Sequence, residues 1–141
     1  MIISNEIYKA MMNRAPKSPP EVGGILGKDR NIVTCFEYDN GIATDKLCTY
    51  VPDVVRLNNV IEKWSEQNIS FCGIFHTHFF GVRTLSDGDK KYINNILSAM
   101  PNTINRLYFP IVLPETKEMV VYLAIRSGEK IRIVEDVIEI I

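Results

Sequence analysis

The sequence has few histidines, few cysteines and no long apolar runs. Its 141 residues include two histidines and three cysteines, and these cysteines form no C-x-x-C pair: Cys35, Cys48 and Cys72. An odd number of scattered cysteines does not fit a disulfide framework, so we expect reduced thiols, as in a cytoplasmic protein.

Membrane and export signals are also lacking. No apolar stretch approaches the roughly 20 residues that span a bilayer, and the start, MIISNEIYKAMMNR, lacks the charged-then-apolar order of a signal peptide. The net charge is −1 and the sequence has no polybasic run, which argues against nucleic acid or an anionic membrane as a partner. We therefore expect a cytoplasmic protein that binds neither.

The sequence does have the length and composition of one ordinary domain. Hydrophobic residues make up 46% and charged residues 23%, as in soluble globular proteins, and we expect residues 1–141 to form a single α/β domain. Hydrophobic periodicity and turn residues predict helices and strands along the chain. The predicted helices cover about residues 4–16, 53–67 and 86–100, and the predicted strands cover 21–27, 31–39, 69–78, 106–113, 119–125 and 130–141.

The two histidines, His76 and His78, lie together at the end of the apolar strand predicted over 69–78. Residues two apart on a strand share a face, with Cα atoms roughly 7 Å apart. Two imidazoles at that spacing can converge on one ion, because a Zn–N bond is about 2.0–2.1 Å long. The alternative is an ordinary pair with one histidine buried and the other exposed.

Cys72 falls on the same strand face as His76, which raises the alternative of a Cys–His nucleophile. Four residues of extended strand, however, separate the two by roughly 13 Å, beyond hydrogen-bonding distance. We interpret Cys72 as a core residue, since free cysteine is often buried.

Asp89 follows Ser86 by three residues at the start of the helix predicted over 86–100. This spacing is typical of a capping box, in which Asp89 only stabilises the helix N-terminus. The same turn comes directly after the H-x-H loop, so Asp89 can also face the histidines. Two histidines and one carboxylate form the ligand set of a catalytic zinc site, with a fourth position left for water. Asp87 is the competing carboxylate.

Glu21 begins the segment EVGGILG, directly after two prolines. Taken alone, Glu21 is most simply interpreted as an acidic residue on the surface beside a turn. With a metal nearby, a carboxylate that is not a ligand can take a proton from the attacking water and return it to the leaving nitrogen. Gly23 and Gly24 lack Cβ atoms and would let this strand pass close to another backbone.

Together these residues resemble the JAMM signature of the JAB/MPN/Mov34 metallopeptidases: E-x-G-G-I-L-G, then H-T-H, seven residues, and S-x-x-D. The resemblance implies a central mixed β-sheet flanked by helices, similar to the cytidine deaminase fold. It further implies that His76, His78 and Asp89 bind one Zn²⁺ per chain, that Glu21 is the general base, and that Ser86 stabilises the oxyanion.

The resemblance also implies a substrate class for a compact, prokaryotic-type JAB domain. Such zinc metallopeptidases cleave a peptide or isopeptide bond at the C-terminus of a ubiquitin-like or sulfur-carrier-like protein, in some cases alongside E1-like or E2-like partners. Two further hypotheses stay open: a non-catalytic interaction module that retains a zinc site, and a zinc hydrolase of small amides.

The loop after the histidines departs from the family pattern. Phe79 and Leu85 occupy positions where the family frequently has proline, so loop shape and substrate preference are expected to differ. Phe79 and Phe80 are candidates for lining an apolar substrate groove, and the alternative is that they tuck under the loop.

Overall fold

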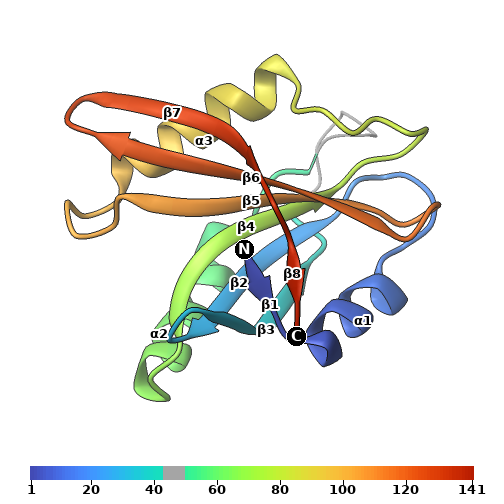
Figure 1. Ribbon diagram of the computed structural model, residues 1–141, viewed down its shortest axis with the longest axis horizontal. Coiled ribbons are helices and arrows are strands. Elements are labelled where there is room, and N and C mark those ends of the chain that lie inside the picture. The colour runs from blue at the N-terminus through green and yellow to red at the C-terminus, as the bar shows by residue number, and fades with distance from the viewer. Residues whose placement is uncertain (43–49) are drawn as a thin grey trace.

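The structure is a computed structural model that describes residues 1–42 and 50–141, and within these residues its centre is one mixed sheet of eight strands (Figure 1). The strand order is β7-β6-β5-β4-β2-β3-β1-β8. The strands are β1 (Ile2–Ile3), β2 (Gly23–Asp29), β3 (Ile32–Asp39), β4 (Ser70–Thr77), β5 (Arg106–Leu113), β6 (Glu118–Ser127), β7 (Lys130–Asp136) and β8 (Glu139–Ile140). The helices are α1 (Asn5–Arg14), α2 (Val54–Glu66) and α3 (Asp87–Ala99).

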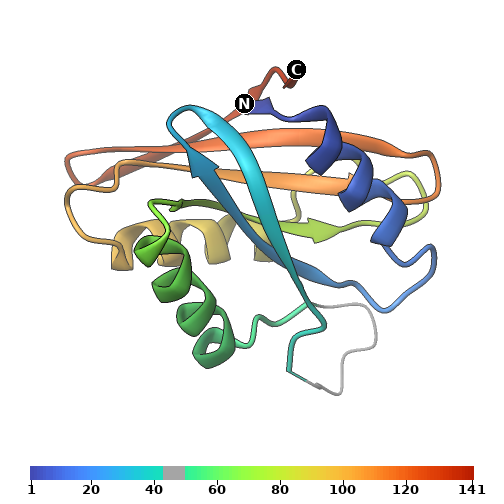
Figure 2. The ribbon, with the colours of Figure 1, turned by 90° about the horizontal axis from the view of Figure 1, so that it is seen from below.

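The sheet combines parallel and antiparallel pairs. Strand β4 runs parallel to β5 and antiparallel to β2, whereas β1 is parallel to both β3 and β8. Helix α1 covers one face of the sheet, and helices α2 and α3 cover the other (Figure 2). The predicted α/β class, a central mixed sheet flanked by helices, is therefore confirmed.

Both faces of the central strands are buried, because successive side chains on a strand point to opposite faces. Leu26 and Phe75 belong to the core beneath α1, while their neighbours Ile25 and Ile74 belong to the core beneath α2 and α3. This double burial explains the nearly continuous apolar sequence of β4, as predicted. It also makes β4 a rigid support for the residues at its carboxyl end.

The C-terminal segment differs from the sequence prediction of one continuous strand over 130–141. Strand β7 ends at Asp136, Val137 is 80% exposed, and β8 then pairs with β1 on the opposite edge of the sheet. The sheet is therefore curled: β7 and β8 lie at its opposite edges, yet only two residues join them. The prediction also missed β1, which has only two residues and no periodicity to detect.

The cysteines that the structure describes are free thiols, as expected. Cys72 is buried in the core, and burial raises the pKa of its thiol to about 12, so it is not a ready nucleophile. Burial also raises the pKa of Cys35, and Cys48 lies outside the described residues. Among the described residues, no helix has the length and apolar character needed to cross a membrane.

Serine and aspartate side chains cap the N-termini of the three helices. Ser4 accepts a hydrogen bond from the backbone of Ile7, and Asp53 accepts one from the backbone of Arg56. Ser86 caps α3 in the same way. The start of α3 is therefore set by the serine of the S-x-x-D motif.

Arg126 fixes the other end of α3 from strand β6. Its guanidinium donates to four backbone carbonyls at the C-terminus of the helix and just beyond it: Leu97, Met100, Pro101 and Ile104. The last carbonyls of a helix have no partner in a following turn, and a cation at this end also interacts favourably with the helix dipole. Arg126 thus ties α3, which carries Asp89, to the sheet.

Replacing Arg126 with methionine should lower the free energy of unfolding by about 1.5–3 kcal/mol, because several charge-assisted hydrogen bonds are lost. Urea denaturation measures this change. Arg132→Met is the matched control, since Arg132 is exposed on β7 and makes no ion pair or side-chain hydrogen bond among the described residues. Equal stability of the two variants would contradict the capping role.

Candidate metal centre

Strand pairing brings Glu21 to the histidines, although 55 residues separate it from His76 in the sequence. Strand β2 lies between β3 and β4, with Gly23 opposite His76. Just before β2, Val22 forms two hydrogen bonds with Thr77. The Thr77 backbone N–H donates to the Val22 carbonyl (2.8 Å), and Thr77 Oγ1 accepts the Val22 backbone N–H (2.9 Å). Thr77, the residue between the two histidines, therefore fixes the position of Val22, the residue next to Glu21.

The two glycines after Glu21 allow the close strand packing that the sequence predicts. A Cβ on Gly24 would lie 2.0 Å from the carbonyl oxygen of Glu37 on β3. A Cβ on Gly23 would lie 2.5 Å from the carbonyl oxygen of Phe75 and 2.3 Å from the Tyr50 ring. All three distances are too short for a side chain at either position.

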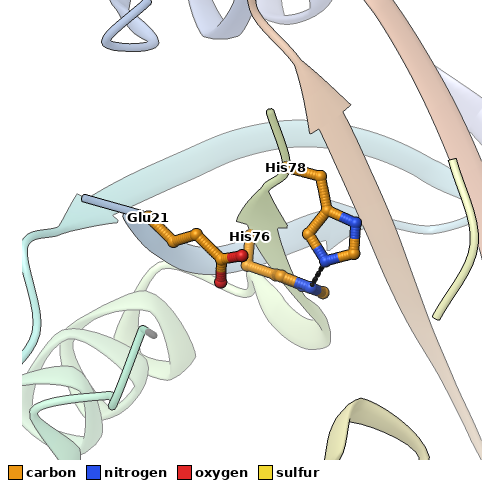
Figure 3. Close-up of side chains that lie close together, drawn as sticks. All are labelled: Glu21, His76 and His78. Carbon is orange, nitrogen blue, oxygen red and sulfur yellow. Dashed lines mark hydrogen bonds between the residues drawn. The ribbon is translucent and has the colours of Figure 1, made fainter. Parts of the chain in front are cut away.

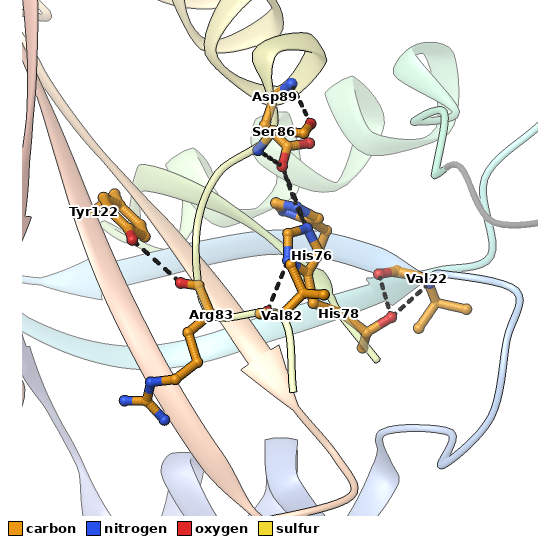
Figure 4. Close-up of polar contacts among 9 residues, drawn as sticks. Val22, His76, His78, Val82, Arg83, Ser86, Asp89 and Tyr122 are labelled. Atoms are coloured by element: carbon orange, nitrogen blue, oxygen red, sulfur yellow. Dashed lines mark hydrogen bonds and ion pairs between the residues drawn. The ribbon is translucent and has the colours of Figure 1, made fainter. Parts of the chain in front are cut away.

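His76 and His78 converge, as predicted from their spacing (Figure 3). Their Nε2 atoms are 2.8 Å apart, so these two ring nitrogens must share a proton or a cation. On the far side of the His78 ring, Nδ1 lies 3.1 Å from the carbonyl oxygen of Val82 (Figure 4). Nδ1 therefore carries the proton and donates it to Val82, which leaves the Nε2 lone pair free to bind a metal.

Asp89 lies within reach of both rings. Its Oδ2 is 3.4 Å from His76 Nε2 and 3.3 Å from His78 Nε2. Tetrahedral zinc with bonds of about 2.0–2.1 Å places neighbouring ligand atoms roughly 3.3 Å apart. The two Asp89 distances match that spacing, and the 2.8 Å between the two Nε2 atoms is about 0.5 Å shorter than it.

The capping box that the sequence predicts at the start of α3 is present, and it orients the Asp89 side chain. Ser86 Oγ accepts the backbone N–H of Asp89 (3.0 Å), and Asp89 Oδ2 accepts the backbone N–H of Ser86 (2.9 Å). The Asp89 carboxylate thus caps the helix and lies close to both histidines at the same time. Asp87, the competing carboxylate, is exposed on the first turn of the same helix.

Glu21 completes a ring of candidate ligands. The ligand atoms of Glu21, His76 and His78 all lie within 4.8 Å of one another, so this group could hold a metal ion. Two carboxylates, Glu21 and Asp89, therefore compete for the third ligand position. Asp89 lies closer than Glu21 to both imidazoles. This is the arrangement expected if Asp89 is a ligand and Glu21 lies beside the metal without binding it.

The pKa values of the acidic groups are displaced in opposite directions. Burial, the largest influence, would raise the pKa of Asp89, but the two imidazoles beside it, His76 and His78, outweigh burial and hold this pKa well below its usual range. Burial raises the pKa of Glu21, and the nearby histidine charges offset this only in part. Two carboxyl groups whose surroundings displace their pKa values in opposite directions are typical of functional sites in which the two groups have different roles.

Glu21, His76, His78, Ser86 and Asp89 all line one open cleft of about 590 Å³, and the rest of its lining is mostly apolar. Both candidate aromatics line it, but in different ways: Phe79 is buried, whereas Phe80 is 79% exposed at the rim. Other apolar and aromatic residues complete the walls: Pro19, Tyr50, Val51, Pro52, Ile74, Val82, Tyr92, Ile93 and Phe109.

The loop that carries Phe80 is fixed by contacts with the β5–β6 hairpin. Glu115 accepts the backbone N–H of Phe80 (2.6 Å), and Arg83 forms an ion pair with Glu118. The Tyr122 hydroxyl donates to the carbonyl of Arg83 (3.2 Å; Figure 4). This loop, which lacks the prolines of the family pattern, is therefore held by polar contacts.

Three supporting groups were not identified from the sequence: the Val82 carbonyl, the paired backbone of Val22, and Tyr50. The first two act through backbone atoms, which carry no signal of residue type. Thr77 faces away from the histidines, because neighbouring residues of a strand point to opposite faces, and its hydroxyl forms hydrogen bonds with Val22.

Replacing Gly24 with alanine should lower the free energy of unfolding by at least about 1–3 kcal/mol, because the added Cβ meets a backbone oxygen that cannot move without breaking the sheet. Gly88→Ala is the matched control. Its Cβ would have only Ser86 Oγ nearby, at 3.7 Å, so stability should be unchanged or rise by up to about 1 kcal/mol. Thermal denaturation distinguishes the two, and a stable Gly24→Ala variant would refute the tight packing.

Comparison with known proteins shows which known fold this chain resembles. No protein-family model and no curated protein sequence matches the chain. Among solved structures, a Desulfitobacterium hafniense protein aligns with a TM-score of 0.70 at 19% identity, covering 99% of this chain and 92% of its own. A JAB1/MPN domain protein from Archaeoglobus fulgidus aligns with a TM-score of 0.57 at 17% identity, covering 100% of this chain and 99% of its own. The chain thus has a JAB/MPN-like fold.

Proposed function

We propose that this protein is a zinc-dependent metallopeptidase that hydrolyses a peptide or isopeptide bond at the C-terminus of a ubiquitin-like or sulfur-carrier-like protein. The observation that carries the proposal is the convergence of His76, His78, Asp89 and Glu21 in one mostly apolar cleft. The JAB/MPN-like fold and the resemblance of the sequence motif to the JAMM signature support the same reaction class.

In this proposal His76, His78 and Asp89 are the zinc ligands, and Glu21 is not. Their mutual distances of 2.8–3.4 Å suit a shared ion better than the longer reach to Glu21. The low pKa of Asp89 keeps it ionised and ready to bind a cation. The Val82 carbonyl orients His78 from outside the ligand set, a support that metal-binding histidines usually have.

Zinc held there would polarise the scissile carbonyl and make water more acidic. Glu21 takes a proton from the attacking water and returns it to the nitrogen that leaves as the C–N bond breaks. Ser86 Oγ accepts the Asp89 N–H, so its hydroxyl hydrogen stays available for the carbonyl oxygen as negative charge develops there.

The cleft suits an extended chain end better than a folded surface. Its apolar lining comes from several segments, among them Tyr50–Pro52 and the loop with Phe79, Phe80 and Val82, and its ionisable side chains belong to the candidate metal centre. An extended tail in this cleft would place one carbonyl at the candidate metal centre while its other groups contact apolar residues. The exposed ring of Phe80 is the candidate contact at the entrance.

The ligand assignment predicts different zinc contents for two neighbouring aspartates. Asp89→Ala should lose bound zinc, whereas Asp87→Ala should keep about one zinc per chain, because Asp87 is exposed. Both variants change the charge of the first turn of α3 equally, so the effect on the helix dipole is matched. Elemental analysis of protein purified without chelator measures the content, and full zinc in Asp89→Ala would mean that another carboxylate is the third ligand.

The catalytic assignment predicts that Glu21→Gln keeps its zinc and its fold but hydrolyses substrate roughly 10²–10⁴-fold more slowly, because an amide cannot accept the proton of water. The assay follows cleavage of a panel of ubiquitin-like C-terminal fusions and of small acyl amides by wild type and variant. Loss of zinc in the variant would make Glu21 a ligand.

The same panel separates the competing functions. Wild-type cleavage of small amides alone would indicate a small-molecule hydrolase. Wild-type protein that is fully loaded with zinc and cleaves nothing would indicate a non-catalytic module.

A further inference from the structure

The loop that follows the histidines is attached to the β5–β6 hairpin at two points. Glu115, in the turn of this hairpin, accepts the backbone N–H of Phe80 (2.6 Å). Farther along the loop, the carbonyl of Arg83 accepts the hydroxyl of Tyr122 on β6 (3.2 Å; Figure 4), and the Arg83 guanidinium pairs with Glu118 at the start of β6. Both ends of this short stretch of loop are therefore tied to the same hairpin.

Val82 lies between the two attachment points, and its carbonyl faces His78. The carbonyl oxygen lies 3.1 Å from Nδ1 of the His78 ring (Figure 4) and can only accept a hydrogen bond, so Nδ1 donates. The backbone N–H of Val82 donates to the carbonyl of Phe79 (3.3 Å), and the backbone N–H of His78 donates to the carbonyl of Val112 on β5 (3.0 Å). The β5–β6 hairpin thus holds the backbone of His78 directly and the partner of its ring through the loop.

The backbone of this loop needs such external support. Between Phe79 and Leu85 it contains no proline that would stiffen it. Phe80 has a φ of 58° and Gly81 a φ of 72°. Glycine adopts this left-handed conformation freely, but a phenylalanine there is strained and keeps it only when the surrounding contacts hold the chain. The contacts from the hairpin supply this constraint.

The two β6 residues that hold Arg83 share one face of the strand, because they are four positions apart. The ring of Tyr122 packs against the core beneath α2 and α3, so its hydroxyl is held in place by a fixed ring. The Arg83 and Glu118 side chains are about half exposed, and an exposed ion pair adds little to overall stability. Its effect is therefore expected in the local shape of the loop.

We infer that Tyr122 and the Arg83–Glu118 ion pair position the candidate zinc ligand His78: they hold the loop so that the Val82 carbonyl keeps its hydrogen bond to Nδ1, which points Nε2 toward the metal. The inference rests on the metal-binding part of the proposed function. It extends the candidate metal centre to β6, a strand that carries no residue of the JAMM-like motif.

The test compares two double variants that each remove one guanidinium and one phenolic hydroxyl. Arg83→Met/Tyr122→Phe loosens the loop. Arg132→Met/Tyr38→Phe is the matched control: Arg132 is exposed on β7, and the Tyr38 hydroxyl donates to the Met11 carbonyl (2.8 Å) beneath α1. Competition with a chelating indicator measures the dissociation constant for zinc in each protein.

Arg83→Met/Tyr122→Phe should bind zinc about tenfold more weakly than wild type, the lower end of the loss that follows when a partner of a ligating histidine is removed. The control should bind zinc as wild type does. Loss of a positive charge near the site would by itself strengthen cation binding, so a weaker affinity cannot be a charge effect. Tyr122→Phe alone, which keeps the packed ring, should weaken zinc binding in the same direction to a smaller extent.

A second measurement uses the zinc-free proteins and does not depend on metal binding. Nitrogen-15 NMR follows the Nδ1 proton of His78, one of only two histidines in the chain. This proton should exchange with water faster in Arg83→Met/Tyr122→Phe than in wild type or the control, because its bond to Val82 is no longer held in place.

The outcomes separate this inference from the proposed function. Equal zinc affinity in the two double variants, whether weakened or not, or an unchanged exchange rate of the Nδ1 proton, would overturn the inference and leave the proposed function intact. Wild-type protein that binds no zinc would refute the metal centre and the inference with it. Zinc binding without cleavage of any substrate would refute the proposed reaction alone.

Discussion

The hydrogen bonds between Thr77 and Val22 are the interaction on which the candidate metal centre depends. Thr77 lies between the two histidines, is fully buried, and bonds Val22 through both its backbone and its side chain. The strand that carries the histidines is thereby locked to the residue beside Glu21. Because β4 is buried on both faces and cannot shift easily, this lock fixes the distance between Glu21 and the imidazoles.

The site also depends on burying several titratable groups in one place. Two carboxylates and two imidazoles would repel or lose solvation if they were brought together without partners. Here three of the four have a compensating contact: the histidines with Asp89, Asp89 with the start of α3, and His78 also with a backbone carbonyl. A divalent cation between these ligand atoms would complete the balance of charge, which is why the arrangement favours metal binding.

Much of this could be predicted from sequence, because several signals are local. The H-x-H on an apolar strand, the S-x-x-D capping box and the glycines after Glu21 each reflect geometry within a few residues, and the structure places all of them as expected. The meeting of Glu21 with the histidines could be expected only from the family resemblance, since no local pattern encodes strand order.

Other features lacked a local signal. The break between β7 and β8 follows from the curl of the whole sheet, and periodicity along one strand does not reveal it. Tyr50 and Asp39, 11 residues apart, meet through a hydrogen bond between their side chains. In sequence they are an ordinary tyrosine and an ordinary aspartate.

The central claim is that one zinc ion sits among four named side chains, and anomalous X-ray diffraction at the zinc absorption edge tests it most directly. Crystals of zinc-loaded protein should give one strong peak about 2.0–2.2 Å from His76 Nε2, His78 Nε2 and an Asp89 carboxylate oxygen, with Glu21 beside the metal and outside bonding distance. A peak bonded to Glu21 in place of Asp89, or no peak at the histidines, would contradict the account.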